Sequence, residues 1–287
     1  MLCERDGALL SNKTTRTPNS TPPRYGVSTL MQIGSLKLKY CKYGWMLFSG
    51  PYIGKCFDLY GQYSESEVSM MRAFLRDGST VVDIGANIGD LTVPLARAVG
   101  ETGRVYAIES HPENFNVLCA NLAMNSLRNT KPINAFVATS DEVDTGNRVW
   151  GKFAYVSETW SPQFFALDSL DLAACDLIKV DVDGKELDVL QSGEMQIEKH
   201  RPILYFENDV RDSSAELLAY VIGKLGYKVY WHPAPIFDEN NFFGNPVNHW
   251  APQNIVSLMV LGVPSERKKD ISGLRQINDK NDWWESA

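Results

Sequence analysis

The sequence predicts an α/β fold built on an open, mostly parallel β-sheet with helices on both faces. From residue 80 onward, strand-like and helix-like segments alternate along the chain, which is the pattern of consecutive strand–helix–strand units. The strand-like segments are continuous apolar runs, as in strands that are buried on both faces. The 287 residues include 44% hydrophobic and 11% aromatic side chains, which is ordinary for a globular protein with a substantial core.

Each element follows from a local pattern. We expect seven strands, at residues 80–84, 104–108, 133–137, 177–181, 203–207, 227–231 and 255–261. Helices are expected at residues 88–99, 113–125, 184–192 and 214–225. Ahead of this core, residues 36–48 alternate in the manner of a β-hairpin, and a helix is expected over residues 66–75.

The chain divides by composition into three parts. Residues 1–27 are rich in Ser, Thr, Asn and Pro and are expected to form a flexible leader, because they bury too little apolar surface to order themselves. A single domain is expected over residues 28–264, with an N-terminal extension at 28–76 and the core at 77–264. Residues 265–287 form a polar tail. The irregular stretch 139–166 is expected to be a long insertion near the ligand face.

Charge and cysteine content exclude several classes of protein. The net charge is −7, so we expect no nucleic-acid partner, which would favour a basic surface. The five cysteines are scattered without a Cys-x-x-Cys pair, so neither a disulfide framework nor a structural zinc site is expected. We also expect no signal peptide and no transmembrane segment, because no apolar run is long enough. These features indicate a cytoplasmic protein.

The most informative segment is residues 81–90, Val-Val-Asp-Ile-Gly-Ala-Asn-Ile-Gly-Asp. A β-branched strand leads through a small-residue turn into a helix beginning near Ile88, whose free amides would point at a ligand. The order Asp83-x-Gly85-x-Asn87-x-Gly89 is not the Gly-x-Gly-x-x-Gly of dinucleotide sites. An acid at the strand end repels phosphate and suits a cationic ligand. S-adenosylmethionine (SAM) is such a ligand, with an ammonium and a sulfonium.

A second acid supports the hypothesis that the ligand contains a nucleoside, as SAM does. Glu109 ends the next strand, 24 positions after Gly85, and an acid there accepts hydrogen bonds from both ribose hydroxyls. Ser110 follows it and is a candidate for the adenine pocket. Asp83 is expected to anchor the turn or, through water, the methionine ammonium, while Asn87 fixes the turn. The alternative is a plain strand–helix–strand unit whose acids only cap helices.

The chain resembles the FkbM-type methyltransferases, which are class I SAM-dependent enzymes. The resemblance covers about residues 61–263 and rests on six segments: Tyr60-Gly-Gln-Tyr-Ser-Glu65, Val82-Asp-Ile-Gly-Ala-Asn-Ile-Gly89, Gly103-Arg-Val-Tyr-Ala-Ile-Glu109, Asn116-Val-Leu-Cys-Ala-Asn121, Leu177-Ile-Lys-Val-Asp-Val-Asp-Gly-Lys-Glu186, and Pro202-Ile-Leu-Tyr-Phe-Glu207. Asp183 stands where most members have Glu. The resemblance implies a Rossmann-like sheet of seven strands with the last antiparallel, and O-methylation, often of sugars or natural products.

Four residues are candidates for catalysis. Ligands of parallel sheets bind outside the carboxyl ends of the strands, where Asp181 and Glu207 are expected, with His232 just after a later strand end. Lys179 precedes Asp181 by two positions, on the same strand face, and is expected to keep it ionised. Methylation of a hydroxyl needs a proton acceptor, and Asp181, Glu207 and His232 are the candidates. Asp181 also adjoins the cofactor in this fold. No metal is expected.

The sequence therefore predicts a SAM-dependent O-methyltransferase acting on a small-molecule or carbohydrate acceptor, and it leaves the oligomeric state open. One alternative is a non-catalytic binding protein that retains the SAM fold. Another is a nicotinamide dehydrogenase, which the missing third glycine disfavours.

Overall fold

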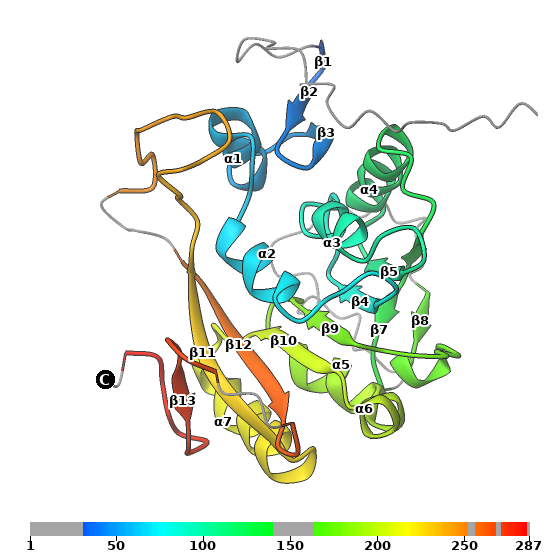
Figure 1. Ribbon diagram of the computed structural model, residues 1–287, viewed down its shortest axis with the longest axis vertical. Coiled ribbons are helices and arrows are strands. Elements are labelled where there is room, and N and C mark those ends of the chain that lie inside the picture. The colour runs from blue at the N-terminus through cyan, green and yellow to red at the C-terminus, as the bar shows by residue number, and fades with distance from the viewer. Residues whose placement is uncertain (1–30, 140–162, 252–255, 268–270, 286–287) are drawn as a thin grey trace, which may run out of the picture.

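The structure is a computed structural model that describes residues 31–139, 163–251, 256–267 and 271–285. Its central sheet has eight strands in the described chain, in the order β13-β11-β12-β10-β9-β4-β5-β6 (Figure 1). Their bounds are β4 (Thr80–Ile84), β5 (Arg104–Glu109), β6 (Thr130–Asn134), β9 (Leu177–Val180), β10 (Ile203–Glu207), β11 (Tyr227–Pro235), β12 (Val256–Pro264) and β13 (Arg275–Ile277).

The strand directions confirm the predicted fold. Neighbouring strands from β6 to β10 are parallel. β12, the last in sequence of the seven predicted strands, runs antiparallel to both β10 and β11. The strand order reverses beside β4, so the carboxyl ends of β4, β5 and β9 meet at the crevice where ligands of such sheets bind.

Helices cover both faces of the sheet (Figure 1). On one face lie α2 (Glu65–Arg72), α3 (Thr92–Ala98) and α4 (Pro112–Met124). The opposite face is covered by α5 (Glu186–Ser192), α6 (Glu194–His200) and α7 (Arg211–Ala219), which continues as a π-helical turn, Tyr220–Lys224. Each face has its own apolar cluster, because side chains alternate between the two faces along each strand. A short 3₁₀ turn, Leu167–Ser169, precedes β9.

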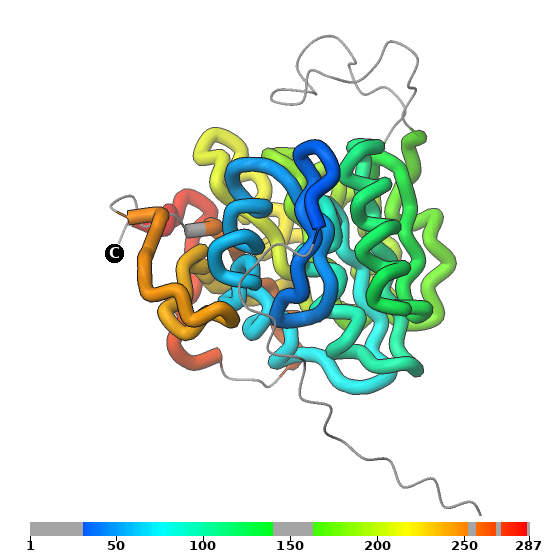
Figure 2. The backbone as a smooth tube through the Cα atoms, turned by 90° about the horizontal axis from the view of Figure 1, so that it is seen from above, coloured from blue at the N-terminus to red at the C-terminus, as the bar shows by residue number. Residues whose placement is uncertain are grey.

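The N-terminal extension is a small antiparallel sheet with a helix: β1 (Met31–Ile33), β2 (Leu36–Cys41), β3 (Gly44–Phe48) and α1 (Ile53–Tyr60). Figure 2 shows it running beside α4. Two asparagines four residues apart, Asn121 on α4 and Asn125 just after its end, bind the backbone of β3. Their Oδ1 atoms accept from the Leu47 and Trp45 amides, at 2.7 and 3.0 Å, and their Nδ2 atoms donate to the carbonyls of the same two residues. The side-chain amides thus take the place of a neighbouring strand.

Part of the predicted tail lies on the sheet. β13 pairs antiparallel with β11, and the Trp283 ring packs edge-on against Trp231, with 5.7 Å between ring centroids. We therefore propose that the single domain continues past residue 264 to include β13. The predicted leader and residues 140–162 of the predicted insertion lie outside the described residues.

One predicted strand is divided in the structure, and one predicted helix begins a turn later than expected. The strand expected over residues 133–137 is divided at Ala135 into β6 and β7 (Phe136–Val137), and β7 leaves the main sheet to pair with β8 (Phe164–Phe165). The helix expected from Ile88 begins at Thr92, because the intervening residues form the turn required by Gly89, whose φ is +88°.

Candidate active site

A buried ion pair joins the two central strands. Asp83 on β4 lies opposite Lys179 on β9, so both side chains leave the same face of the sheet. Lys179 Nζ is 3.3 Å from Asp83 Oδ1 and donates to the Gly85 carbonyl at 2.8 Å. Asp83 Oδ2 accepts from the Thr92 hydroxyl at 2.6 Å. Asp83 is therefore engaged within the protein and ties β4 to β9 and to the start of α3.

Lys179 stays charged although it is buried. Burial lowers its pKa, but the carboxylates of Asp83, Asp181 and Asp90 outweigh burial, and the net pKa of Lys179 lies above the ordinary lysine value. Its Nζ is also 3.6 Å from Asp181 Oδ2. The predicted pairing of Lys179 with a strand-end acid is therefore present, and the lysine is shared between two of them.

The glycines of the turn allow close approach of two chains. A Cβ added at Gly85, where φ is +78°, would lie 1.8 Å from the Asp181 carbonyl oxygen. A Cβ at Gly89 would lie 2.9 Å from Leu118 Cδ1 on α4. Asn87 between them also has a positive φ, +48°, which asparagine tolerates better than most residues. The turn thus lies in close contact with Asp181 at the end of β9 and with α4. A side chain at either glycine would displace the turn.

Glu109 fixes the loops that flank the crevice. Its Oε2 accepts from the Asn87 amide and its Oε1 from the His111 amide, each at 2.7 Å. It is 6% exposed, and burial raises its pKa above the ordinary glutamate value. Asn134 at the end of β6 donates to the carbonyls of Glu109 and Ser110. Because a carboxylate oxygen accepts two hydrogen bonds, both oxygens retain capacity for ribose hydroxyls, and that role stays a prediction.

Asp181 and Glu207 form a carboxyl pair at the ends of adjacent strands. Burial, followed by the charge of the neighbouring Asp181, raises the pKa of Glu207 well above the ordinary glutamate value. Glu207 therefore holds a proton at neutral pH and can donate a hydrogen bond to Asp181. The Asp181 side chain is 39% exposed. The pair therefore offers a partly accessible carboxylate at the edge of the crevice.

His232 is separate from that pair. It lies within β11, two strands from Glu207 across Met259, and the expectation that it follows the strand end is wrong because β11 continues to Pro235. Its Nδ1 is 2.7 Å from the Tyr205 hydroxyl and its Nε2 is 3.1 Å from Ser66 Oγ. The ring is 6% exposed, and burial lowers its pKa. Both nitrogens are engaged in contacts between the sheet and α2.

Two further acids, Glu67 and Asp90, belong to the site and were missed from the sequence. They are 2% and 8% exposed. Glu67 Oε1 accepts from Ser64 Oγ at 2.6 Å, whereas Glu67 Oε2 and Asp90 Oδ1 are buried without a hydrogen-bond partner. Burial raises their pKa values to about 7 and about 8. The sequence did mark both neighbourhoods, since Glu67 follows the Tyr60–Glu65 segment and Asp90 follows Gly89.

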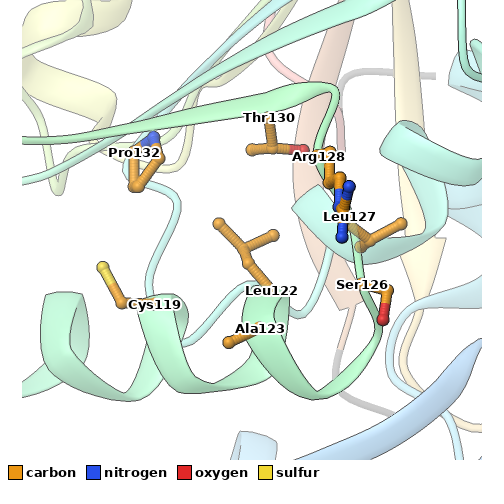
Figure 3. A pocket seen from close by; sticks show the side chains of 8 residues that line it. All are labelled: Cys119, Leu122, Ala123, Ser126, Leu127, Arg128, Thr130 and Pro132. Atoms are coloured by element: carbon orange, nitrogen blue, oxygen red, sulfur yellow. The ribbon is translucent and has the colours of Figure 1, made fainter.

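Two pockets lie away from this cluster of acids. One, of about 290 Å³, lies between α4 and the start of β6, the edge strand of the sheet, and is lined by residues such as Leu122 and Pro132 (Figure 3). A second pocket, of about 420 Å³, lies between the N-terminal sheet and α1. Among the described residues, no cluster of His, Cys, Asp and Glu is arranged to hold a metal ion. No described helix is long and apolar enough to cross a bilayer.

Known proteins match part of this chain. Residues 83–229, just over half of the chain, match the model of the methyltransferase FkbM domain. A tRNA(Phe) (4-demethylwyosine(37)-C(7)) aminocarboxypropyltransferase of Methanocaldococcus jannaschii is 34% identical over 91 residues, which are 32% of this chain and 36% of that protein. The chain spans little more than a third, or less, of the curated relatives it matches.

Solved structures of methyltransferases superpose on it in part. The FkbM methyltransferase of Methylobacillus flagellatus is 18% identical, with a TM-score of 0.46, over 66% of this chain and 44% of that one. A SAM-dependent O-methyltransferase of Thermotoga maritima is 14% identical, with a TM-score of 0.49, over 81% of this chain and 79% of that one. The family match, and not these partial superpositions, identifies the chain: it belongs to the FkbM methyltransferases, a family with the class I methyltransferase fold and SAM as its cofactor.

Proposed function

We propose that this protein transfers the methyl group of SAM to a hydroxyl oxygen of a small-molecule or carbohydrate acceptor. The observation that carries the proposal is the Asp181–Glu207 carboxyl pair at the carboxyl edge of the sheet. Such a pair suits a reaction in which a neutral hydroxyl must give up its proton while a new bond forms to its oxygen.

The residues of the crevice fit SAM. Glu67 and Asp90 each present a buried oxygen without a hydrogen-bond partner, and Lys179 is the cation that faces the buried acids there. An excess of carboxylates over cations in a buried site is costly unless a positive ligand compensates it. The turn at Gly85 and Glu109 with its remaining acceptor capacity suit the nucleoside part. When bound, the cofactor supplies an activated methyl group on a sulfonium.

The chain's own residues then position the acceptor and take its proton. Asp181 is the partly exposed member of the pair, and Lys179 Nζ lies 3.6 Å from its Oδ2. A hydroxyl that donates a hydrogen bond to Asp181 is held in one orientation, with an oxygen lone pair directed away from the carboxylate. Alignment of this kind supplies a large share of the rate in bimolecular transfers.

The charge of the protein favours a neutral acceptor over a nucleic acid. The net charge is −7, and the acids along the crevice would repel a phosphate backbone.

An exposed aromatic ring lies on the loop that follows β11: Phe242 is 42% exposed and packs near Tyr40. That loop is tied to the segment before α2, since Gln62 Oε1 accepts from the Phe242 amide at 2.9 Å. Such rings support stacking against a sugar or planar acceptor.

The described cysteines are free thiols, which supports a cytoplasmic location.

A methyl-transfer assay with isotopically labelled SAM tests the proposal. The purified protein is incubated with monosaccharides and hydroxylated natural products in one arm and with unmodified tRNA in another, and products are followed by mass. We expect a methylated hydroxyl product in the first arm and none in the second. Methylation of tRNA alone would replace the acceptor class. Binding of SAM without transfer to any acceptor, including those of a cell extract, would favour the non-catalytic alternative.

A further inference from the structure

Four acids of the described chain have a buried side-chain oxygen without a hydrogen-bond partner: Glu65, Glu67, Asp83 and Asp90. Asp83 forms an ion pair with Lys179, and Glu65 forms one with Lys42, whereas neither Glu67 nor Asp90 forms an ion pair within 4 Å among the described residues. Glu109 and Glu186 are also buried, but their oxygens accept backbone amides: Glu109 from Asn87 and His111, and Glu186 from Val182 and Gly184. Glu67 Oε2 and Asp90 Oδ1 have no donor in hydrogen-bonding geometry, although the Ser257 hydroxyl is close to Glu67. Burying an acceptor without a donor costs free energy, so these two oxygens indicate a place for a ligand that donates hydrogen bonds.

The surrounding charges make that ligand a cation. Glu67 comes from α2 and Asp90 from the turn before α3, and both face Lys179 on β9, whose charge is already shared with Asp83 and Asp181. The phenols of Tyr63 and Tyr52, from the segment around α1, lie near the same acids, as does Tyr205 from β10, which faces Glu67 and Asp181. The nearby Glu207 adds a further acid beside Asp181. One lysine therefore faces several carboxyl groups.

Resting on the proposed function, we propose that Glu67 and Asp90 are the subsite for the methionine ammonium of SAM, and that they give up protons to solvent when it binds. Of the two positive groups of the cofactor, only the ammonium has N–H donors for the two unpartnered oxygens. The sulfonium has none, and its methyl must remain open to the acceptor. Asp83, the acid expected from the sequence to anchor the ammonium through water, is instead engaged by Lys179 and Thr92.

Proton release follows from the burial of the pair. Without a cation, burial keeps the pKa of Glu67 at about 7 and that of Asp90 at about 8, so both hold protons for much of the time at pH 7. A bound ammonium favours the ionised forms. The protons leave to the buffer, and no covalent bond changes.

The test is calorimetric titration at pH 7 with SAM, S-adenosylhomocysteine and 5′-methylthioadenosine, each in two buffers of different ionisation enthalpy. The first two ligands carry the ammonium and the third lacks it. The variants are Glu67→Gln and Asp90→Asn. The control is Glu65→Gln, on the same helix but hydrogen-bonded to Tyr43 on the hairpin side.

We expect each variant to bind SAM and S-adenosylhomocysteine about ten- to a hundredfold more weakly, and to release fewer protons than the wild type. Methylthioadenosine should bind within about threefold of wild type and release no protons, which also shows that the variants are folded. The control should match the wild type throughout. Unchanged affinities and proton counts would overturn the proposal, and so would equal weakening of all three ligands or weakening of SAM alone. Failure of every adenosyl ligand to bind the wild type would instead overturn the proposed function.

Discussion

The imidazole of His232 and the hydroxyl of Tyr205 are joined by a 2.7 Å hydrogen bond inside the core. The other ring nitrogen of His232 is 3.1 Å from Ser66 Oγ on α2. The histidine therefore links two strands of the sheet to the helix that carries Glu67. A ring with both nitrogens engaged and little exposure has no free position for the proton of an acceptor, so its contribution is to hold α2 in place.

Replacing His232 by Ala should cost stability more than catalysis. Burial lowers the pKa of this histidine, so the folded state prefers the neutral ring. The stability that this gives is complete above the unfolded pKa and is lost as pH falls from that value through the lower pKa of the folded state. We expect the variant to lose about 2–3 kcal/mol of unfolding free energy at pH 8, and less at pH 5. Denaturant unfolding at both pH values measures this. A loss of turnover of a hundredfold with unchanged stability would return His232 to the role of base.

The sequence predicts well those elements whose pattern is local. The β-branched run at β4 and the apolar, partly aromatic run at β10 predict both of these strands with their observed ends. β11 is longer than predicted because Pro233 and Pro235 interrupt its pattern. β13 pairs only with residues 229–231, so beyond them one side of β11 has no partner in the described sheet, and the exposed prolines need donate no hydrogen bond there.

Features that depend on tertiary contacts are harder to predict. β13 is too short and too polar to be recognised without the strand it pairs with. Glu67 lies in an ordinary helical pattern, and only the packing of α2 on the sheet brings it to Lys179. The strand-end acids Asp83, Asp181 and Glu207 could be anticipated, because parallel strands place their ends at one edge. Their burial could not be predicted in the same way. Asp83 is fully buried beside Lys179, whereas the Asp181 side chain, which also lies near this lysine, is partly exposed.

Lys179→Met should destabilise the protein strongly and abolish SAM binding. Removing the ammonium leaves Asp83 buried without its charge partner and the Gly85 carbonyl without its donor. Breaking a buried pair in this way costs about 3–5 kcal/mol. The exposed Lys228→Met is the matched control and should stay within about 0.5 kcal/mol of wild type. Chemical denaturation with a SAM titration measures both effects, and a stable variant that binds SAM normally would contradict the role given to this lysine.

Glu109→Gln should weaken nucleoside binding through the ribose. The charge-assisted bonds to the two hydroxyls contribute about 1.5–3 kcal/mol, or roughly tenfold to a hundredfold in affinity. Titrations of adenosine and 2′,3′-dideoxyadenosine isolate the effect, because only adenosine has the hydroxyls. Glu109→Ala should also lower stability, since it leaves the Asn87 and His111 amides without their acceptor. Equal weakening of both nucleosides would remove Glu109 from the ribose role.

Glu67→Gln should stabilise the cofactor-free protein in alkali. Burial raises the pKa of Glu67 from 4.5 to about 7, so between these values the folded state holds a proton that the unfolded chain has lost. The unfolding free energy of the wild type therefore falls as pH rises through this window. We expect the glutamine variant to gain up to roughly 3 kcal/mol at pH 8 and less than about 1 kcal/mol at pH 5. A gain that does not depend on pH would mean that Glu67 carries no burial penalty.

Asp181→Asn should lower turnover far more than SAM affinity. Asparagine keeps the shape of the side chain but no longer accepts a proton, so we expect a loss of about a hundredfold or more in kcat. Glu207→Gln should be milder, because the amide still donates a hydrogen bond to Asp181, as the protonated Glu207 does. Single-turnover kinetics with SAM in excess, together with SAM titrations, separate the loss of turnover from any loss of SAM affinity.

Repeating the assay in EDTA distinguishes a proton acceptor from a metal ligand. If Asp181 bound a metal, activity would fall in EDTA and return with Mg²⁺. Normal turnover in both variants would place the base elsewhere, and the acids contributed by α2 and the turn before α3 would be the next to substitute.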